Sequence, residues 1–179
     1  MKLMFRCKLL AFSPAILALV FSSCGEPDPA NLPVINTPAN AKVDLSKVTL
    51  SISNAKITRI NENKYTLNFD YTVTNHSGAH LAFPCLYDST DDLIEVGLTD
   101  NTDQKLVPGK RPMEGLTLTE PRPLKIANGP VTRSYSVPIM PEVRDSGDLI
   151  TLRVRLHAPS RYDELRSTVA APLVQVPWP

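Results

Sequence analysis

The sequence predicts an all-β fold, and three observations carry that prediction. From about residue 41 onward, apolar residues recur at every second position, the period of a half-buried strand, and a helical period is nowhere sustained. Glycine, proline and asparagine separate these stretches at intervals typical of turns between strands. The segment 41–179 is long enough to bury its own core. Together these features predict one domain, an immunoglobulin-like antiparallel β-sandwich of about seven to nine strands.

The clearest strand is predicted between residues 65 and 74. Its apolar positions alternate with threonine, asparagine and aspartate, so one face should be buried and the other solvated. The apolar positions are Tyr65, Leu67, Phe69, Tyr71 and Val73.

The segments on either side of this strand also alternate. Residues 48–52 predict an earlier strand, and the parity change before Ala55 and Ile57 predicts a bulge or bend near Asn54. A turn is predicted at 75–78. The alternation then resumes, with Cys85 on the apolar side, at Leu81, Phe83, Cys85 and Tyr87.

The rest of the domain reads as further strands. In one of them Ile150, Leu152, Val154 and Leu156 should face inward. A short helical turn is expected at 161–167, too brief to anchor a helical layer. The predicted strands are 94–98, 116–118, 124–127, 131–137 (after a tight Asn128-Gly129 turn), 149–157 and about 170–176.

The N-terminus has the layout of an export signal, predicted over residues 1–23. Lys2, Arg6 and Lys8 precede the uncharged stretch Leu9–Phe21, which is shorter than a membrane span. Ser22-Ser23-Cys24 then resembles the lipobox of bacterial lipoproteins. The resemblance implies that Cys24 becomes the first residue and carries two or three acyl chains, enough for stable membrane anchoring.

Two features near Cys24 bear on where the protein resides. The alternative to lipidation is an ordinary secretory signal cut near Ser23. Gly25 follows the cysteine, and without an aspartate there the outer membrane is favoured over the inner one. We therefore expect a lipoprotein of the cell envelope.

Residues 24–40 are predicted to be the lipidated cysteine and a proline-rich tether. Prolines at 27, 29, 33 and 38 favour an extended chain, although 32–35 alone could pack on the domain as an irregular strand. Without the three basic residues of the leader, 16 Lys and Arg face 18 Asp and Glu, a net charge near −2. This balance argues against a nucleic-acid partner.

Part of the chain resembles a known type of module. Residues 69–77, followed by Leu86-Tyr87-Asp88 and Leu93-Ile94, are similar to the strand–turn–strand core of FxLYD-like immunoglobulin-like modules in bacterial lipoproteins. The resemblance implies an adhesive, assembly or accessory domain without chemistry, and it supplies no functional residues.

Catalytic signatures are absent from the sequence. It contains no GxSxG elbow, no HExxH, no CxxC and no phosphate-binding glycine loop. We therefore expect a non-enzymatic accessory or interaction protein without a cofactor.

The alternative function is copper or zinc binding by His76, His80 and Cys85, which lie around one turn and the strand after it. Against metal binding, His80 and Cys85 are an odd number of residues apart on one predicted strand, so their side chains should point to opposite faces of the sheet. The competing interpretation is two turn histidines and a buried thiol that packs as a small apolar residue.

Two further clusters are candidate sites. Asp88, Asp91 and Asp92 offer carboxylates for calcium, although a solvated turn is the favoured interpretation. Arg153 and Arg155 with His157 share the outward face of their strand with Thr151. This stripe could meet an anionic partner, or its charges could guard a sheet edge or solvate an exposed face.

Overall fold

The computed structural model describes residues 31–85, 89–100, 122–139, 148–158 and 166–179. They form ten β-strands and one short 3-10 helix, and these ranges contain no α-helix. The predicted all-β class is therefore confirmed. Within the same ranges, no helix has the length and hydropathy required to cross a membrane.

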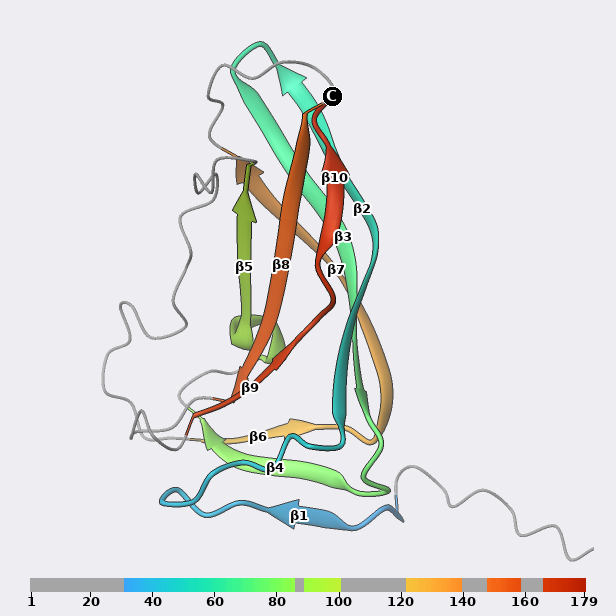
Figure 1. Ribbon diagram of the computed structural model, residues 1–179. Helices are drawn as coiled ribbons and strands as arrows, with labels where there is room; N and C mark the ends of the chain where they lie inside the picture. Colours follow the sequence, from blue (N-terminus) through green and yellow to red (C-terminus); the bar gives the residue numbers. More distant parts are fainter. Residues whose placement is uncertain (1–30, 86–88, 101–121, 140–147, 159–165) are drawn as a thin grey trace, which may run out of the picture.

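The strands divide into three sheets (Figure 1). The first, β2-β3-β7, is named the β3 sheet. In the second, the β8 sheet, β5 lies on one side of β8 while β9 and β10 lie on the other. The third, β1-β4-β6, is the end sheet. The elements are β1 (Val34–Asn36), β2 (Val48–Asn61), β3 (Lys64–Asn75), β4 (His80–Cys85), η2 (Thr90–Leu93), β5 (Ile94–Thr99), β6 (Arg122–Ile126), β7 (Gly129–Ile139), β8 (Leu149–Ala158), β9 (Ser167–Ala170) and β10 (Val174–Pro177).

The sheets are arranged as a sandwich closed at one end. In Figure 1 the β3 and β8 sheets run lengthwise and face each other, and the end sheet crosses the lower end. Buried residues of all three sheets belong to one apolar cluster. The strand pairs are antiparallel except for β1 with β4, which is parallel. The predicted sandwich is confirmed, with one parallel pair that the sequence did not indicate.

Strand β3 has the alternation that the sequence predicts. Leu67, Phe69, Tyr71 and Val73 are buried, Tyr65 is half-buried, and the residues between them are only partly covered. Burying one such side chain stabilises the fold by about 1.5–3 kcal/mol relative to leaving it exposed. The inner face of β3 is therefore a principal part of the core.

The bulge predicted near Asn54 is present in β2. The register with β3 shifts between Ser53 and Lys56, and Asn54 adopts a left-handed φ of 56°. After the shift Ile57 is buried, as its parity predicts. The bulge thus keeps apolar residues on the inner face of a long strand.

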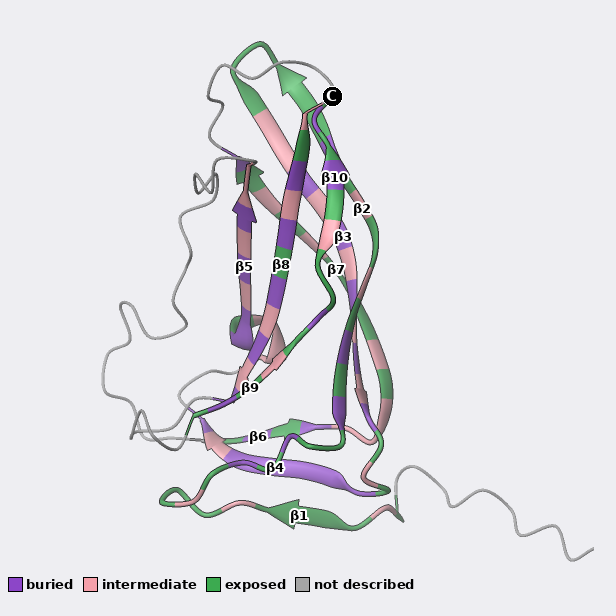
Figure 2. Ribbon diagram, viewed as in Figure 1, coloured by how far each residue is buried: buried purple, intermediate pink, exposed green. Residues whose placement is uncertain are grey.

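Strand β8 forms the centre of the opposite sheet. Its four inward residues, Ile150, Leu152, Val154 and Leu156, have no exposed surface, as predicted. Figure 2 shows the resulting alternation of buried and more exposed residues along β8.

The last strand differs from its prediction. Residues 170–176 were expected to form one strand, but β9 begins at Ser167 and a break at 171–173 separates it from β10. Ala170 faces Arg155 while Val174 faces Leu152, so one extra residue is accommodated across the break. Pro172 lies there and has no N–H for the ladder.

The predicted tether is too long at its C-terminal end. Val34–Asn36 of the expected segment 24–40 form β1 beside β4, which matches the packing alternative for residues 32–35. His80 N–H donates to the Pro33 carbonyl and Thr37 N–H to the Ala82 carbonyl, both at 2.8 Å. The predictions for Cys24, Tyr87, the strand 116–118 and the helical turn through residue 165 lie outside the described residues.

A buried asparagine fixes the corner where the β3 sheet meets the end sheet. Asn75 is 1% exposed. Its Nδ2 donates to the carbonyl oxygens of Ala79 (2.9 Å) and Ile126 (3.4 Å), and its Oδ1 accepts from the Ser77 N–H (3.0 Å). One side chain therefore ties the turn after β3 to the strand β6.

We expect Asn75→Ala to lower the free energy of unfolding by about 2 kcal/mol, because it removes three hydrogen bonds of a buried side chain. Urea unfolding followed by circular dichroism measures this loss. His76→Ala changes the exposed neighbour and should stay within about 0.5 kcal/mol of the wild type. Equal stability of the two variants would contradict the role given to Asn75.

Candidate functional site

The outer face of the β3 sheet is covered by short polar side chains, and we name it the hydroxyl face. Its centre is the row of five outward residues of β3, and its flanks are their register partners on β2 and β7. Only Asp70 and Lys56 carry formal charge. The residues are Thr66, Asn68, Asp70, Thr72 and Thr74 of β3; Thr49, Ser51, Ser53, Asn54, Lys56 and Thr58 of β2; and Pro130, Thr132, Ser134, Ser136 and Pro138 of β7.

Hydrogen bonds run across the hydroxyl face from strand to strand. Asp70 accepts from Asn54 Nδ2 and from Ser134 Oγ, both at 2.6 Å. One row further, Ser136 Oγ donates to Asn68 Oδ1 at 3.0 Å. On the other side, the hydroxyls of Thr72 and Thr132 lie 2.8 Å apart. The side chains are therefore already fixed relative to one another.

The bulge in β2 creates a hollow beside Asp70. The left-handed Asn54 directs its amide to the Asp70 carboxylate. An open hollow of about 650 Å³ lies there. It is lined by polar residues and by three apolar or aromatic ones, namely Asn54, Lys56, Asn68, Asp70, Ser134 and Ser136 with Ala55, Phe69 and Tyr135. Bulges often reorient side chains at functional sites.

The Asp70 carboxylate is held in its charged form. The hydrogen bond from Asn54, and then that from Ser134, lowers the pKa of Asp70 below its ordinary value of 3.8. A carboxylate has about four lone-pair positions, and these two bonds use only two of them. Asp70 therefore presents charged acceptor capacity to a ligand in the hollow.

The outer face of the β8 sheet has a different chemistry, and it holds the predicted basic stripe. Arg153 is exposed and Arg155 half-buried, as expected for outward positions. Guarding a sheet edge is not their role, because β8 is the central strand of its sheet. Glu95 faces Arg155 in register, and His157 contacts Glu95 through Nε2 and Thr168 through Nδ1 (3.0 Å). The stripe thus carries an acidic residue within it.

The structure does not bring His76, His80 and Cys85 together. His76 Nε2 lies 3.2 Å from Thr49 Oγ1, and His80 Nδ1 accepts from the Asn128 N–H at 3.1 Å. Cys85 is buried in the core, five residues along β4 from His80 and about 16 Å away at the usual rise per residue. No group of three metal-ligating side chains occurs in the part of the chain that is described.

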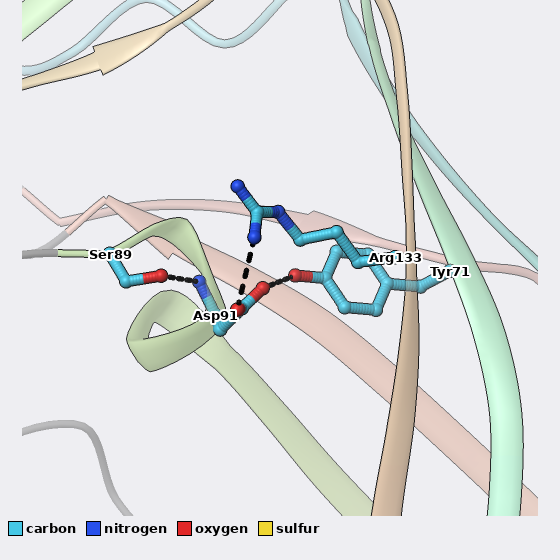
Figure 3. A network of polar contacts seen from close by, with 4 residues as sticks. All are labelled: Tyr71, Ser89, Asp91 and Arg133. Atoms are coloured by element: carbon cyan, nitrogen blue, oxygen red, sulfur yellow. Dashed lines mark hydrogen bonds and ion pairs between the residues drawn. The ribbon is translucent and has the colours of Figure 1, made fainter.

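Of the acidic calcium candidates, Asp91 is occupied by donors from the β3 sheet (Figure 3). Its Oδ1 accepts from the Tyr71 hydroxyl, and its Oδ2 lies 3.5 Å from Arg133 Nη1. The Ser89 hydroxyl caps the same turn by accepting from the Asp91 N–H at 3.1 Å. Asp92 is exposed, and Asp88 lies outside the described residues. Asp91 therefore serves as a clamp that ties η2 to β3 and β7.

The clamp also perturbs the tyrosines that face it. Burial, and then the hydrogen bond to Asp91, raises the pKa of the Tyr71 hydroxyl above its usual range. Burial likewise raises the pKa of Tyr135, with the charges of Asp91 and Asp92 adding to the effect. Both phenols stay neutral at physiological pH, which fits a structural role.

Comparison with known proteins does not assign the chain to a family. No family model matches the sequence, and no curated protein resembles it significantly. One solved structure, the X-ray structure of Northeast Structural Genomics Consortium target SoR45, is 10% identical with a TM-score of 0.44. The match covers 74% of this chain and 88% of that chain. A likeness at this level carries no argument about function.

The residues of the Asp70 hollow were not candidates from the sequence. The strand pattern placed Asp70 outward, and the parity change placed a bulge at Asn54. Ser134 belongs to another strand and lies 64 positions from Asp70. The uninterrupted run of polar outward residues on β3 was the one available signal.

We expect Tyr71→Phe to lower the free energy of unfolding by about 1 kcal/mol, because the clamp loses a charge-assisted hydrogen bond while partly exposed Asp91 regains water. Tyr65→Phe is the matched control, since the Tyr65 ring packs on Trp178 (centroids 4.5 Å apart). Thermal melts compare the two. Equal losses in both variants would exclude a specific contribution from the clamp.

We expect the stabilising effect of Asp70 to depend on pH. Because its folded pKa is lowered, the contribution is present above the unfolded pKa and is lost as the pH falls through the folded pKa. The difference in melting temperature between wild type and Asp70→Asn should therefore shrink below about pH 4. Ser134→Ala, which removes one donor, brings the folded pKa of Asp70 closer to the unfolded one, so this variant should lose less stability on acidification than the wild type and complete that loss at a higher pH. A difference that is constant from neutral to acid pH would contradict this.

Proposed function

We propose that the chain is a lipid-anchored, non-enzymatic interaction protein of the bacterial cell envelope. The leader and the lipobox-like Cys24 support the anchor. The observation that carries the interaction role is the hydroxyl face, an exposed and pre-arranged polar surface with a hollow at Asp70. Pre-arranged side chains lose little further entropy when a partner binds.

The segment between Cys24 and β1 would be long enough to hold the domain away from the membrane surface. Cys24 and the start of β1 are ten positions apart, so an extended segment would span about 30 Å. The end sheet would then be the part of the domain nearest the lipid, with the hydroxyl face extending away from it along β2, β3 and β7 (Figure 1). The outer membrane is the proposed location, because Gly25 follows the cysteine.

Copper or zinc binding would require His76, His80 and Cys85 to converge. Instead His76 contacts Thr49, His80 accepts a hydrogen bond from the Asn128 N–H, and Cys85 lies in the core. No observation among the described residues favours it over the interaction role.

We expect the wild-type chain, expressed with an alkyne fatty acid in the growth medium, to be labelled on Cys24 and recovered with outer-membrane fractions. Cys24→Ala should lose the label and leave the membrane, while Cys7→Ala within the leader should keep both properties. Mass spectrometry of the mature N-terminus locates the modification. An unmodified N-terminus created by a cut near Ser23 would refute the anchor.

A further inference from the structure

We propose that the hydroxyl face binds an uncharged glycan strand, with the Asp70 hollow as its central subsite. This inference deepens the proposed function and rests on it, because an exported chain meets such polymers in the envelope. The partner is defined by chemistry: a chain of sugar units whose hydroxyls donate and accept hydrogen bonds.

The centre of the hydroxyl face presents mainly hydrogen-bond acceptors. Ser134 and Ser136 use their hydroxyl protons toward Asp70 and Asn68, so their oxygens keep lone pairs directed to other donors. Asp70 retains two acceptor positions and stays ionised. The centre of the face is therefore rich in acceptors, and a ligand that carries many hydroxyl donors matches it.

The hydroxyl face carries no net charge at its register positions. At the register positions of the hydroxyl face Asp70 and Lys56 cancel, whereas the outer face of the β8 sheet carries Arg153, Arg155 and Glu95. An anionic polymer would need a concentration of basic side chains, and a cationic partner would need several acids. A neutral polymer requires neither, and it fits the face with one carboxylate at the centre.

The hydroxyl face is long enough to contact several sugar units at once. From Thr66 to Thr74 the face extends about 26 Å along β3, which is long enough for several sugar units. Phe69 and Tyr135 also line the hollow, but Phe69 is 2% exposed and its ring packs on that of Tyr135 (centroids 5.3 Å apart) against the core, so stacking on sugars is not the main contribution. Affinity must come from repeated hydrogen bonds and should therefore rise with oligosaccharide length.

The test is co-sedimentation of the full mature lipidated chain, in detergent micelles, with insoluble glycans. Cellulose and chitin serve as the neutral polymers, and purified peptidoglycan, whose peptide stems carry carboxylates, serves as the charged comparison. We expect binding to at least one of the neutral polymers, competed more strongly by long than by short soluble oligosaccharides. Binding to peptidoglycan alone would contradict an uncharged partner. Ser134→Arg places a bulky charge at the edge of the hollow and should weaken binding about tenfold or more. Asp70→Asn should weaken it by a smaller factor, because an amide keeps the shape and loses the charge.

The matched control is Gln175→Arg, the same kind of charge insertion at an exposed position on the outer face of the β8 sheet. It should bind like the wild type, and melting curves verify that every variant is folded. The proposal is overturned if the folded wild type sediments with none of the glycans, or if Ser134→Arg binds as well as Gln175→Arg. It is also overturned if Ser134→Arg abolishes only self-association in sedimentation velocity, since the occupant would then be a second copy. Labelling of Cys24 is measured separately, so a failed anchor and a failed glycan site are distinguished.

Discussion

The buried amide of Asn75 is the interaction on which the arrangement of the three sheets depends. Asn75 pairs with Val48 on β2 and with Gly129 on β7, and its side chain reaches across to the carbonyl of Ile126 at the end of β6. Both chain reversals at this corner, one after β3 and one before β7, are thereby fixed to each other. An apolar residue could fill the space, but it would remove the hydrogen bonds that join the turn after β3 to β6. The direction in which β4 and β6 cross the end of the sandwich follows from this corner.

Fixing the corner also fixes the site, because β3 serves two purposes at once. Its inner residues pack into the core, where close packing allows little movement. Its outer residues inherit that rigidity, so Asp70 and Asn68 hold the hydroxyls of β7 in place. The bulge at Asn54 adds an irregularity beside the hollow, and Asn54 lines it. A site built on a strand in this way is more rigid than one built on a loop.

Sequence patterns predict this fold where burial is one-sided and periodic, as on β3 and β8, because period-two alternation reports directly on the two faces of a strand. They predicted the bulge at Asn54 from a parity change, but they missed the interruption near the C-terminal strands. The split of β9 from β10 follows from one extra residue near Pro172, and β1 joins the end sheet although its Val34 and Ile35 are largely exposed. The Asp70 hollow could not be predicted from the sequence for another reason. Its residues come from three strands, and no local sequence pattern gives the register between those strands. Parity alone did separate His80 from Cys85, which is why the three metal candidates never converge.

A neutral outer sheet face is unusual for a protein that must stay soluble, since charged residues normally occupy such surfaces and discourage association. The chain does not lack charge, because it places arginines and a glutamate on the opposite outer face. Weak, repeated contacts to a neutral polymer would account for this asymmetry at little cost if the proposed lipid anchor confines the domain beside its partner. Such confinement would raise the effective concentration of the two surfaces. Individual hydrogen bonds that are each too weak to detect in free solution would then suffice to occupy the hydroxyl face.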